Sequence, residues 1–488
     1  MVSITCYGGV GEIGGNKILI EENNTRFFLD FGMSFNKNGF YYSEFLQPRK
    51  CNGLQDFFEL GLIPDLKGIY RLDYLQHMGR GSEKGIIDAV FLSHAHADHA
   101  QYIHFLRKDI PIYGTAASKR ILQVLEETGV DQFGELLTTC DAFTFYKTKN
   151  ETISRVTKKQ KDHVNKRIFH EMHEDQPVSI GDFSVEMIPV DHSLPGACGF
   201  LMRTKNQNIA YTGDIRFHGY HKDLSEHFVE KLSGQKIDCL LCEGTRIKKT
   251  TKDSEEGVQQ TLSDHISKTE GLVFVEHPIR DLDRTLTIYQ SAKENNRTFV
   301  VTLKLAYLLD AFGSDAPFTL EDVFILIPRK SWGLITHDDI TLDQVKRDYA
   351  KWERAFIDHH HAITYKDLQE NPERYVVSMN MWEIKQLIDI QPEKAIWIKS
   401  TCEPFNEEME IDEERKRHWL DHFNIKEFSA HASGHASGIE LTDLIKEIQP
   451  KKLIPIHTQH PDYFIEITQR INEEIKVIPP VYAKKYQI

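Results

Sequence analysis

The sequence concentrates metal-binding side chains in one short stretch, His94-Ala-His96-Ala-Asp98-His99. Imidazole and carboxylate groups are ligands that zinc and its first-row neighbours accept. Since His94 and His96 are two residues apart, an extended backbone points both side chains the same way. Asp98 and His99 follow where a helix should begin, so they can face a second ion beside the first. Histidines this dense beside an acid indicate a metal site rather than a solvated loop.

Three further apolar runs each lead into a histidine or an acid. They end near His192, near Asp214 after a glycine, and at Glu243. Taken singly, each of these residues has an equally good explanation as a turn former. Together with the first cluster they predict one constellation, in which Asp214 can bridge two ions and His192 can complete the first site. Asp30 ends another short strand and is either a partner for a ligand or a turn residue.

Histidines return near the end of the chain. The loop before an amphipathic helix carries His431 and His435, and an apolar strand leads into His457. This pattern places further histidines at loops where ligands would converge. A histidine triplet at 359–361 has no partner acid at a useful spacing, and we expect a solvated loop there.

Strands must deliver these side chains to one edge. The run from Ala89 to Leu92 predicts a buried strand that ends at the first cluster. The glycine-rich segment 8–16 is followed by a strand without an intervening helix, so we expect a glycine turn near the active site rather than a dinucleotide fingerprint. Between about 248 and 392 strands alternate with helices, which predicts a parallel sheet with its own core.

Composition limits the class of protein. The chain has 488 residues and a net charge of −14, which neither supports nor excludes nucleic acid, since bound cations and local basic patches can offset it. Seven scattered cysteines fit a reducing compartment better than a disulfide framework, and Cys239 and Cys242 are expected to be buried thiols. Neither a signal peptide nor a membrane span is recognisable, so we expect a cytoplasmic protein without a membrane anchor.

Two segments leave alternatives open. Residues 33–85 are long, aromatic and irregular, and we expect short helices that wall one side of the site. Their aromatic side chains either form a small satellite core, which we favour, or stack on bases. Residues 147–166 are rich in lysine and either contact a phosphate backbone or form a solvated surface helix.

The order of His94-x-His96-x-Asp98-His99, His192 and Asp214 resembles the metallo-β-lactamase superfamily. That resemblance implies an α/β fold, an αβ/βα sandwich with a two-metal site at one edge of its paired sheets. An α/β insert followed by two more histidines resembles the β-CASP branch. It implies a metallo-β-lactamase domain in two parts, 1–247 and 396–488, around a β-CASP insert at 248–395.

Within that branch the motifs are similar to those of the ribonuclease J family. The acidic motif falls on Glu243, the second motif's histidine on His435 and the third motif's residue on His457, where histidine is typical of enzymes that act on RNA. The likeness implies hydrolysis of RNA phosphodiester bonds, endonucleolytic or from the 5′ end. It implies a single-stranded RNA partner, with or without a 5′-monophosphate, and it admits a homodimer.

The same resemblance implies two zinc ions, with manganese as an alternative. One ion would be held by His94, His96 and His192, and Asp214 would bridge the two. The other ion would be held by three further side chains, Asp98, His99 and His457.

Catalytic roles also follow from the resemblance. Asp98 counts among the catalytic residues as well as the ligands. His435 would donate to a phosphoryl oxygen or to the leaving 3′-oxygen, with Glu243 orienting it. A neighbouring phosphate would be cradled by three residues of one loop, His431, Ser433 and Gly434.

The chain departs from the family pattern in several places. Residues 35–88 and the basic segment before His192 look longer, and Glu243-Gly-Thr-Arg246 is closer to the eukaryotic pre-mRNA cleavage subunit and its prokaryotic relatives. In the 31 residues after His457 we expect a helix and a strand rather than the family's further C-terminal domain, an expectation that puts the family's oligomerisation in doubt. A DNA nuclease on the same scaffold stays an alternative. The insert argues against a small-molecule hydrolase, and the filled ligand positions argue against a silent RNA-binding scaffold.

Overall fold

The computed structural model describes residues 1–488 apart from 44, 130–132, 158–160, 252–253, 334–338 and 403–406. The chain divides into two compact units. The first comprises Met1–Phe217, His221–Lys252 and Gly434–Ile488, and the second comprises His218–Tyr220 and Asp253–Ser433. The chain therefore leaves the first unit and returns to it at Gly434.

Two seven-stranded sheets form the first unit. The first sheet runs, in spatial order, through β10 (Phe169–Glu171), β5 (Ile112–Gly114), β4 (Ala89–Phe91), β3 (Thr25–Leu29), β2 (Ile18–Glu22), β1 (Ser3–Cys6) and β25 (Lys485–Gln487). The second runs through β11 (Val178–Ile180), β12 (Phe183–Pro189), β13 (Cys198–Arg203), β14 (Asn208–Tyr211), β15 (Cys239–Glu243), β23 (Lys452–Ile456) and β24 (Lys476–Val477).

The main core lies between these sheets, and β15 shows how it is built. Cys239 and Leu241 join the cluster that also holds Phe91 of the first sheet. Leu240 and Cys242 point the opposite way and join a second cluster with residues of the outer helices. Since alternate side chains of a strand face opposite sides, a run that is apolar throughout is buried on both faces. Both cysteines are free and buried, as predicted.

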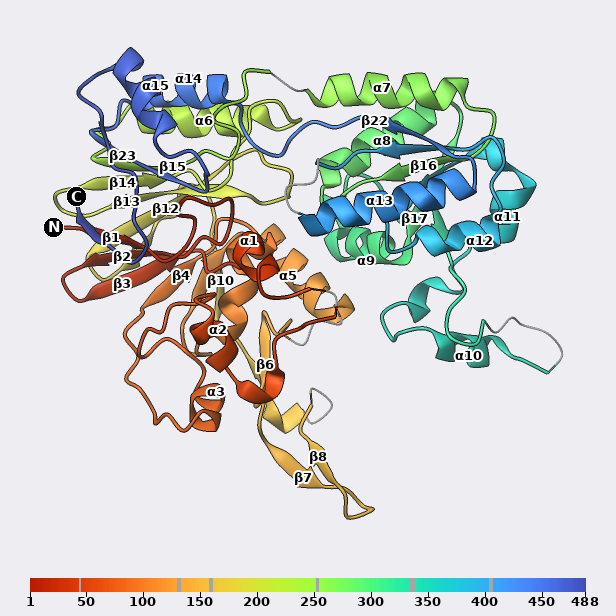
Figure 1. The fold of residues 1–488 in the computed structure, drawn as a ribbon, viewed down its shortest axis with the longest axis horizontal. Coiled ribbons are helices and arrows are strands. Elements are labelled where there is room, and N and C mark those ends of the chain that lie inside the picture. Colours follow the sequence, from red (N-terminus) through yellow and green to blue (C-terminus); the bar gives the residue numbers. More distant parts are fainter. Residues whose placement is uncertain (44, 130–132, 158–160, 252–253, 334–338, 403–406) are drawn as a thin grey trace. The chain divides into compact units, whose positions relative to one another are not determined.

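Helices cover the outer face of the second sheet. Figure 1 shows α6 (Lys222–Ser233), α14 (Gly438–Ile448) and α15 (Tyr463–Ile471) beside β15 and β23. α14 begins at a capping box in which Ser437 and Glu440 satisfy each other's backbone N–H groups. On the other sheet, α5 (Ala116–Thr128) contacts β10. Helix, sheet, sheet and helix give the expected α/β sandwich.

The segment after β3 contains short helices, as predicted. They are α1 (Phe35–Gly39), α2 (Gln55–Glu59) and α3 (Leu72–His77). Phe57, Tyr74 and Phe105 pack as a buried aromatic cluster, which is the satellite core that we favoured. Phe40 and Phe45 are exposed instead, at 70% and 91% of their surface.

The basic segment forms β-ribbons. β6 (Thr138–Cys140) pairs with β9 (Val164–Lys166), and β7 (Phe145–Lys147) pairs with β8 (Ile153–Arg155). In place of the expected surface helix, the described part of this segment holds these strands and one three-residue 3-10 helix, Lys161–His163. Residues 158–160 lie outside the described residues. Threonine and isoleucine flank the turn of β7 and β8, and β-branched residues favour strands over helices.

The second unit is a parallel sheet with its own core, as predicted. Its strands, in spatial order, are β19 (Ala362–Ile363), β18 (Phe324–Leu326), β17 (Thr298–Thr302), β20 (Tyr375–Ser378), β16 (Val273–Glu276), β21 (Ile396–Lys399) and β22 (Lys426–Ser429). Its helices are α7 (Glu255–Lys268), α8 (Leu282–Glu294), α9 (Leu303–Phe312), α10 (Leu342–Val345), α11 (Tyr365–Glu370), α12 (Leu387–Ile390) and α13 (Glu407–His422).

The second unit extends beyond the expected boundary at residue 395. β21 pairs with β16 in parallel, and β22 pairs with β21, so the strands at 396–399 and 426–429 continue the inserted sheet. The first unit resumes at Gly434. Within the described residues, we find no helix that is long and apolar enough to cross a membrane.

Candidate metal centre

The predicted ligands stand at strand ends of the first unit. β4 ends at Phe91, and the chain then places His94 and His96 in an extended turn. α4 (Ala97–Ala100) begins directly after His96, so Asp98 and His99 lie in its first turn. β14, β15 and β23 run parallel to one another, and their carboxyl ends therefore meet at one edge of the second sheet. This edge carries the remaining chemistry-bearing residues, which include Asp214, Glu243 and His457.

Four side chains converge in a first group. His94, His96, His192 and Asp214 each offer one ligand atom, and these atoms lie within 4.8 Å of one another. Nδ1 of His96 is 3.0 Å from Nε2 of His94 and 3.1 Å from Nε2 of His192. Three imidazole nitrogens that face one point are typical of a zinc ligand set.

A second group adjoins the first. The ligand atoms of Asp98, His99 and His457 also lie within 4.8 Å of one another. Oδ2 of Asp98 is 3.2 Å from Nε2 of His457 and 3.8 Å from Nε2 of His99. This group brings together residues separated by more than 350 positions in the sequence.

Asp214 lies between the two groups. Its Oδ2 is 3.2 Å from Nε2 of His99, 3.6 Å from Nε2 of His94 and 3.7 Å from Nε2 of His457. Its Oδ1 is buried without a hydrogen-bond partner, and so is Nε2 of His99. Unpaired polar atoms are costly to bury, and a cation would satisfy both. The donor set and these orphaned atoms fit a zinc centre.

Burial and charge set the protonation of these groups. Burial holds the pKa of His94 and His192 well below its usual range, which favours the neutral imidazole that binds metal. Burial also acts on His99, but Asp214 and Asp30 outweigh it and raise the pKa of that imidazole. The reverse holds for Asp214, where His457 and His99 outweigh burial and lower the pKa of the carboxyl group.

Asp30 forms a hydrogen bond with one of the proposed ligands, as predicted by its interpretation as a partner for a ligand. Its carboxylate accepts hydrogen bonds from Nδ1 of His99 at 2.7 Å, from the Tyr211 hydroxyl at 2.6 Å and from the backbone N–H of Ser93 at 2.7 Å. The residue has φ of +58° and is fully buried. A carboxylate that accepts from the far nitrogen of a ligand fixes the orientation of the ring.

His435 and Glu243 form a pair beside the two groups. Nδ1 of His435 lies 3.2 Å from Oε1 of Glu243 and 3.9 Å from Oδ2 of Asp214. Burial would lower the pKa of His435, but the charges of Glu243 and Asp214 outweigh it and raise that pKa to about 9. The backbone N–H of Thr245 donates to Oε2 of Glu243 at 2.8 Å, which holds the carboxylate in place.

The glycine-rich segment packs against the centre, as predicted. A side chain at Gly14 would place its Cβ 2.5 Å from Oδ2 of Asp98, so only glycine fits this contact. Gly9 accepts a hydrogen bond from the backbone N–H of His457, a residue with φ of +51°. The turn therefore positions two ligands through its backbone and its lack of side chains.

Several supporting residues carry no signal in the sequence. Tyr211 ends β14 and reads as an ordinary core residue, yet its hydroxyl links Asp30 to the side chain of Asn16. Thr245 lies 2.8 Å from Nδ1 of His457 through its hydroxyl oxygen. The only sequence signal for the supporting roles of Tyr211 and Thr245 is that each lies a few residues from a predicted ligand or acid at the end of a strand.

The predicted phosphate loop falls in both units. Gly434 belongs to the first unit, where its carbonyl accepts from Nδ1 of His192 at 2.5 Å. His431 and Ser433 belong to the second unit, where Arg284 donates to Nδ1 of His431 at 3.3 Å. Phosphate binding by this loop stays a prediction.

The triplet at 359–361 acquires an acid that the sequence did not suggest. Glu321 lies 2.7 Å from Nε2 of His360 and 3.9 Å from Nε2 of His359. His360 is 63% exposed, which agrees with a solvated loop. The backbone N–H of His361 donates to Nδ1 of His359, and this bond leaves the ring proton of the neutral imidazole on Nε2, facing Glu321.

Comparison with known proteins agrees with this chemistry. Residues 423–480, which include His435 and His457, match the family described as a Zn-dependent metallo-hydrolase RNA specificity domain. Ribonuclease J 2 of Streptococcus pyogenes is 25% identical over 487 residues, which are 98% of this chain and 73% of that protein. Over most of its length the chain is similar to ribonuclease J. The resemblance inferred from the motifs is thereby confirmed.

Other relatives extend the likeness to ribonuclease J. Ribonuclease J of Helicobacter pylori is 24% identical over 473 residues, and the chain spans 56% of that relative's length. A crystal structure of a protein of unknown function from Enterococcus faecalis V583 superposes with a TM-score of 0.71 at 23% identity and covers 99% of both chains. This superposition confirms the α/β fold.

Proposed function

We propose that this chain is a metal-dependent ribonuclease that hydrolyses RNA phosphodiester bonds at the centre around Asp214. The observation that carries the proposal is the convergence of two groups of imidazole and carboxylate ligands on that one carboxylate. The match of residues 423–480 to an RNA specificity domain and the likeness to ribonuclease J support RNA as the substrate.

Two zinc ions are the proposed complement of this centre, with manganese as an alternative. His94, His96 and His192 would hold one ion, and Asp214 would contribute to both. When bound, such a pair lowers the pKa of an attacking water and stabilises the charge that develops on the scissile phosphate. The other ion would be held by the second group, Asp98, His99 and His457.

His435 is the proposed proton donor. Glu243 lies against its Nδ1, so Nε2 is the nitrogen left to face the leaving 3′-oxygen or a phosphoryl oxygen. The charge of Glu243 raises the pKa of this imidazole, which favours the protonated form that can donate. Asp98 is proposed both as a ligand and as a catalytic residue, and its Oδ2 lies 3.2 Å from Nε2 of His457.

The finer assignments are part of the same proposal. A 5′-monophosphate on single-stranded RNA would be bound by His431, Ser433 and Gly434, and endonucleolytic and 5′-exonucleolytic action both stay open. A cytoplasmic location is supported by seven free cysteines, five of them buried. The resemblance is compatible with a homodimer, which is part of the proposal.

End-labelled single-stranded RNA tests the function. Wild-type protein loaded with zinc should cleave RNA that carries 5′-phosphate, 5′-hydroxyl or 5′-triphosphate ends, and mononucleotides from the 5′-phosphate substrate alone would identify an exonuclease. His94→Ala should abolish cleavage, whereas His227→Ala, at an exposed histidine of α6, should leave it unchanged. Equal activity of His94→Ala would reject the proposal. Faster cleavage of matched single-stranded DNA would favour the DNA nuclease.

A further inference from the structure

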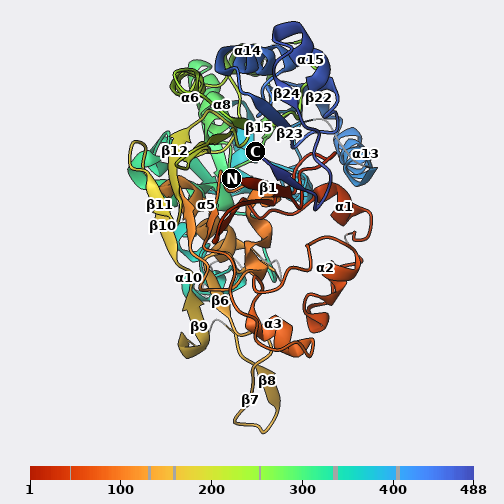
Figure 2. The same cartoon turned by 90° about the vertical axis from the view of Figure 1, so that its left-hand side faces the viewer.

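A hairpin stands out from the body of the first unit. β7 and β8 pair only with each other, and both Figures 1 and 2 show them extending away from the two main sheets of that unit. The backbone N–H of Thr148 donates to the carbonyl of Thr152 at 2.8 Å, and Glu151 takes φ of +59°, so the turn is tight and hydrogen-bonded. The centre around Asp214 uses none of these residues.

One face of this hairpin combines large apolar and basic side chains. Phe145 lies opposite Arg155 and Lys147 lies opposite Ile153 in the register of the two strands. Directly opposed residues and residues two apart share a face, so these four side chains stand on the same side of the ribbon. Phe145 is 59% exposed and Ile153 is 74% exposed. Large exposed apolar side chains that share a face with basic ones offer a surface on which an aromatic base can stack.

The cations of the hairpin are available to a partner. Within the described residues, Lys147, Lys149 and Arg155 make no ion pair, whereas Lys119 of the same unit pairs with Glu171 at 2.7 Å. Within the hairpin itself, residues 145–155, Glu151 is the single acidic residue. In a chain with a net charge of −14, this face is a local exception, and it complements a polyanion.

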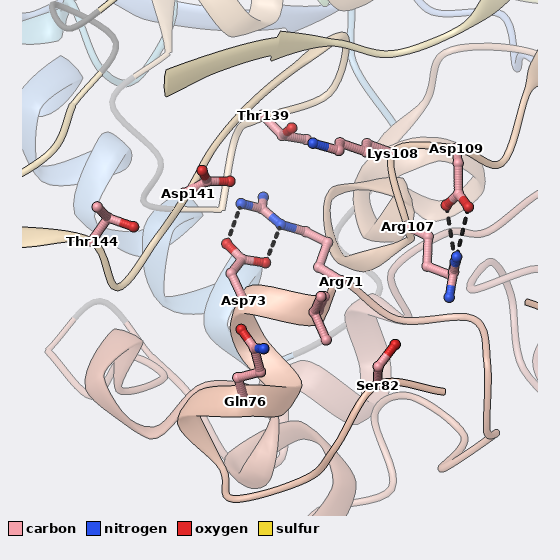
Figure 3. A pocket seen from close by; sticks show the side chains of 11 residues that line it. Arg71, Asp73, Gln76, Ser82, Arg107, Lys108, Asp109, Thr139, Asp141 and Thr144 are labelled. Atoms are coloured by element: carbon pink, nitrogen blue, oxygen red, sulfur yellow. Dashed lines mark hydrogen bonds and ion pairs between the residues drawn. The ribbon is translucent and has the colours of Figure 1, made fainter. Parts of the chain in front are cut away.

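A cavity lies at the base of the hairpin, but its charged residues do not supply the attraction for a polyanion. It has a volume of about 450 Å³, and Thr144, the residue before Phe145, belongs to its lining. Figure 3 shows its two arginines held by carboxylates. Arg71 lies 2.8 Å from Asp73, and Arg107 lies 2.6 Å from Asp109. The charges of the cavity are thus balanced within it, which leaves the uncompensated charge on the hairpin.

We propose that this face of the hairpin binds single-stranded RNA outside the metal centre. The inference rests on the proposed function, since RNA is the substrate proposed there. Phe145 would stack on a base, which every base permits because each has a π-face. Lys147 and Lys149 would contact backbone phosphates. A face that alternates apolar and basic side chains suits RNA, in which bases alternate with phosphates. A protein partner suits it less well, because docking would remove water from each charge that lies beside an apolar residue.

Binding of a 2′-O-methylated 20-nucleotide RNA, measured by fluorescence anisotropy between 50 and 200 mM salt, tests the inference. The double variant Lys147→Gln/Lys149→Gln should make the negative slope of log K against log salt shallower by about 1.4, since each phosphate contact on a single strand contributes roughly −0.7. Phe145→Ala should weaken binding roughly 5- to 150-fold. The matched control Lys205→Gln/Lys236→Gln removes two exposed lysines elsewhere in the first unit, outside residues 423–480, and should leave the slope unchanged.

The outcomes separate this inference from the proposed function. Thermal melting of each variant should match wild type, because every substituted side chain is exposed. If both hairpin variants bind RNA as wild type does, the inference is overturned, and a protein partner becomes the better occupant of this face. Cleavage of unmodified RNA by the wild type is measured separately. A hairpin that binds RNA in a protein that cleaves none would contradict the proposed function alone.

Discussion

Asp30 accepts a hydrogen bond from Nδ1 of His99 at 2.7 Å, and both side chains are fully buried. This bond leaves Nε2 of His99 to face Asp214 and Asp98. The carboxylate of Asp30 reaches this position because its backbone adopts the left-handed conformation at the end of β3. The geometry of one proposed ligand thus depends on a residue that is not itself among the proposed ligands.

We expect Asp30→Asn to weaken zinc binding about 10- to 100-fold. The amide would keep one acceptor oxygen but lose the charge that orients and polarises His99. Competition with a chromophoric chelator measures the affinity. The control Asp443→Asn removes an exposed carboxylate from α14 and should change nothing. Unaltered zinc affinity in Asp30→Asn would show that the bond to His99 is dispensable.

Asp214→Asn should reduce RNA cleavage by roughly two to three orders of magnitude and lower the zinc content per chain. The reason is that one oxygen, Oδ2, lies within 3.8 Å of imidazoles from both ligand groups. Metal analysis of the purified variant and cleavage kinetics on the same preparation check both effects. Full zinc content with full activity would remove Asp214 from the centre.

The core of this site could be predicted because its ligands are dense in sequence or end apolar strands. His94 and His96 are marked by spacing alone, and β15 is marked by an unbroken apolar run. Tyr211 could not be predicted, since a tyrosine at the end of a buried strand has a sufficient explanation in packing. Glu321 could not be paired with His360 either, because β18 and β19 bring their neighbourhoods together only in the folded sheet.

The boundary of the insert shows a second limit of the sequence. Residues 396–399 and 426–429 were expected in the returning part, yet both form strands of the inserted sheet. An apolar run predicts a strand but carries no information on which sheet it joins. Parallel pairing over long connections is decided by packing between distant segments, which local patterns do not record.

Zinc should raise the midpoint of thermal unfolding. A ligand that binds only the folded state at 100 times its dissociation constant adds about 2.7 kcal/mol to the free energy of unfolding. A chelator should therefore lower the midpoint of the wild type by several degrees, and restored zinc should recover it. His192→Ala should blunt this response because it removes an imidazole of the first group. An identical response in wild type and His192→Ala would contradict the ligand assignment.

Glu243→Gln should lower the rate constant of cleavage without lowering zinc content. Oε1 of Glu243 lies 3.2 Å from Nδ1 of His435, and Glu243 belongs to neither group of proposed ligands. Loss of a general acid typically costs 10²- to 10⁴-fold, and we expect the variant of its positioning residue to fall at the lower end. His435→Gln should cost more than Glu243→Gln. The double variant should be no worse than His435→Gln, and additive losses would disprove a shared role.

Lys17 should make stability depend on pH. Burial lowers the pKa of its ammonium group to about 7, although Glu12 acts against this. Between pH 7 and the unfolded value near 10.5, the unfolded chain binds a proton that the folded chain has released, so the free energy of unfolding rises with pH. At about 1.4 kcal/mol per pKa unit, wild type should gain a few kcal/mol over Lys17→Met between pH 7 and 10. Urea unfolding at several pH values measures the gain. The exposed Lys205→Met is the control, and parallel curves for wild type and Lys17→Met would refute the lowered pKa.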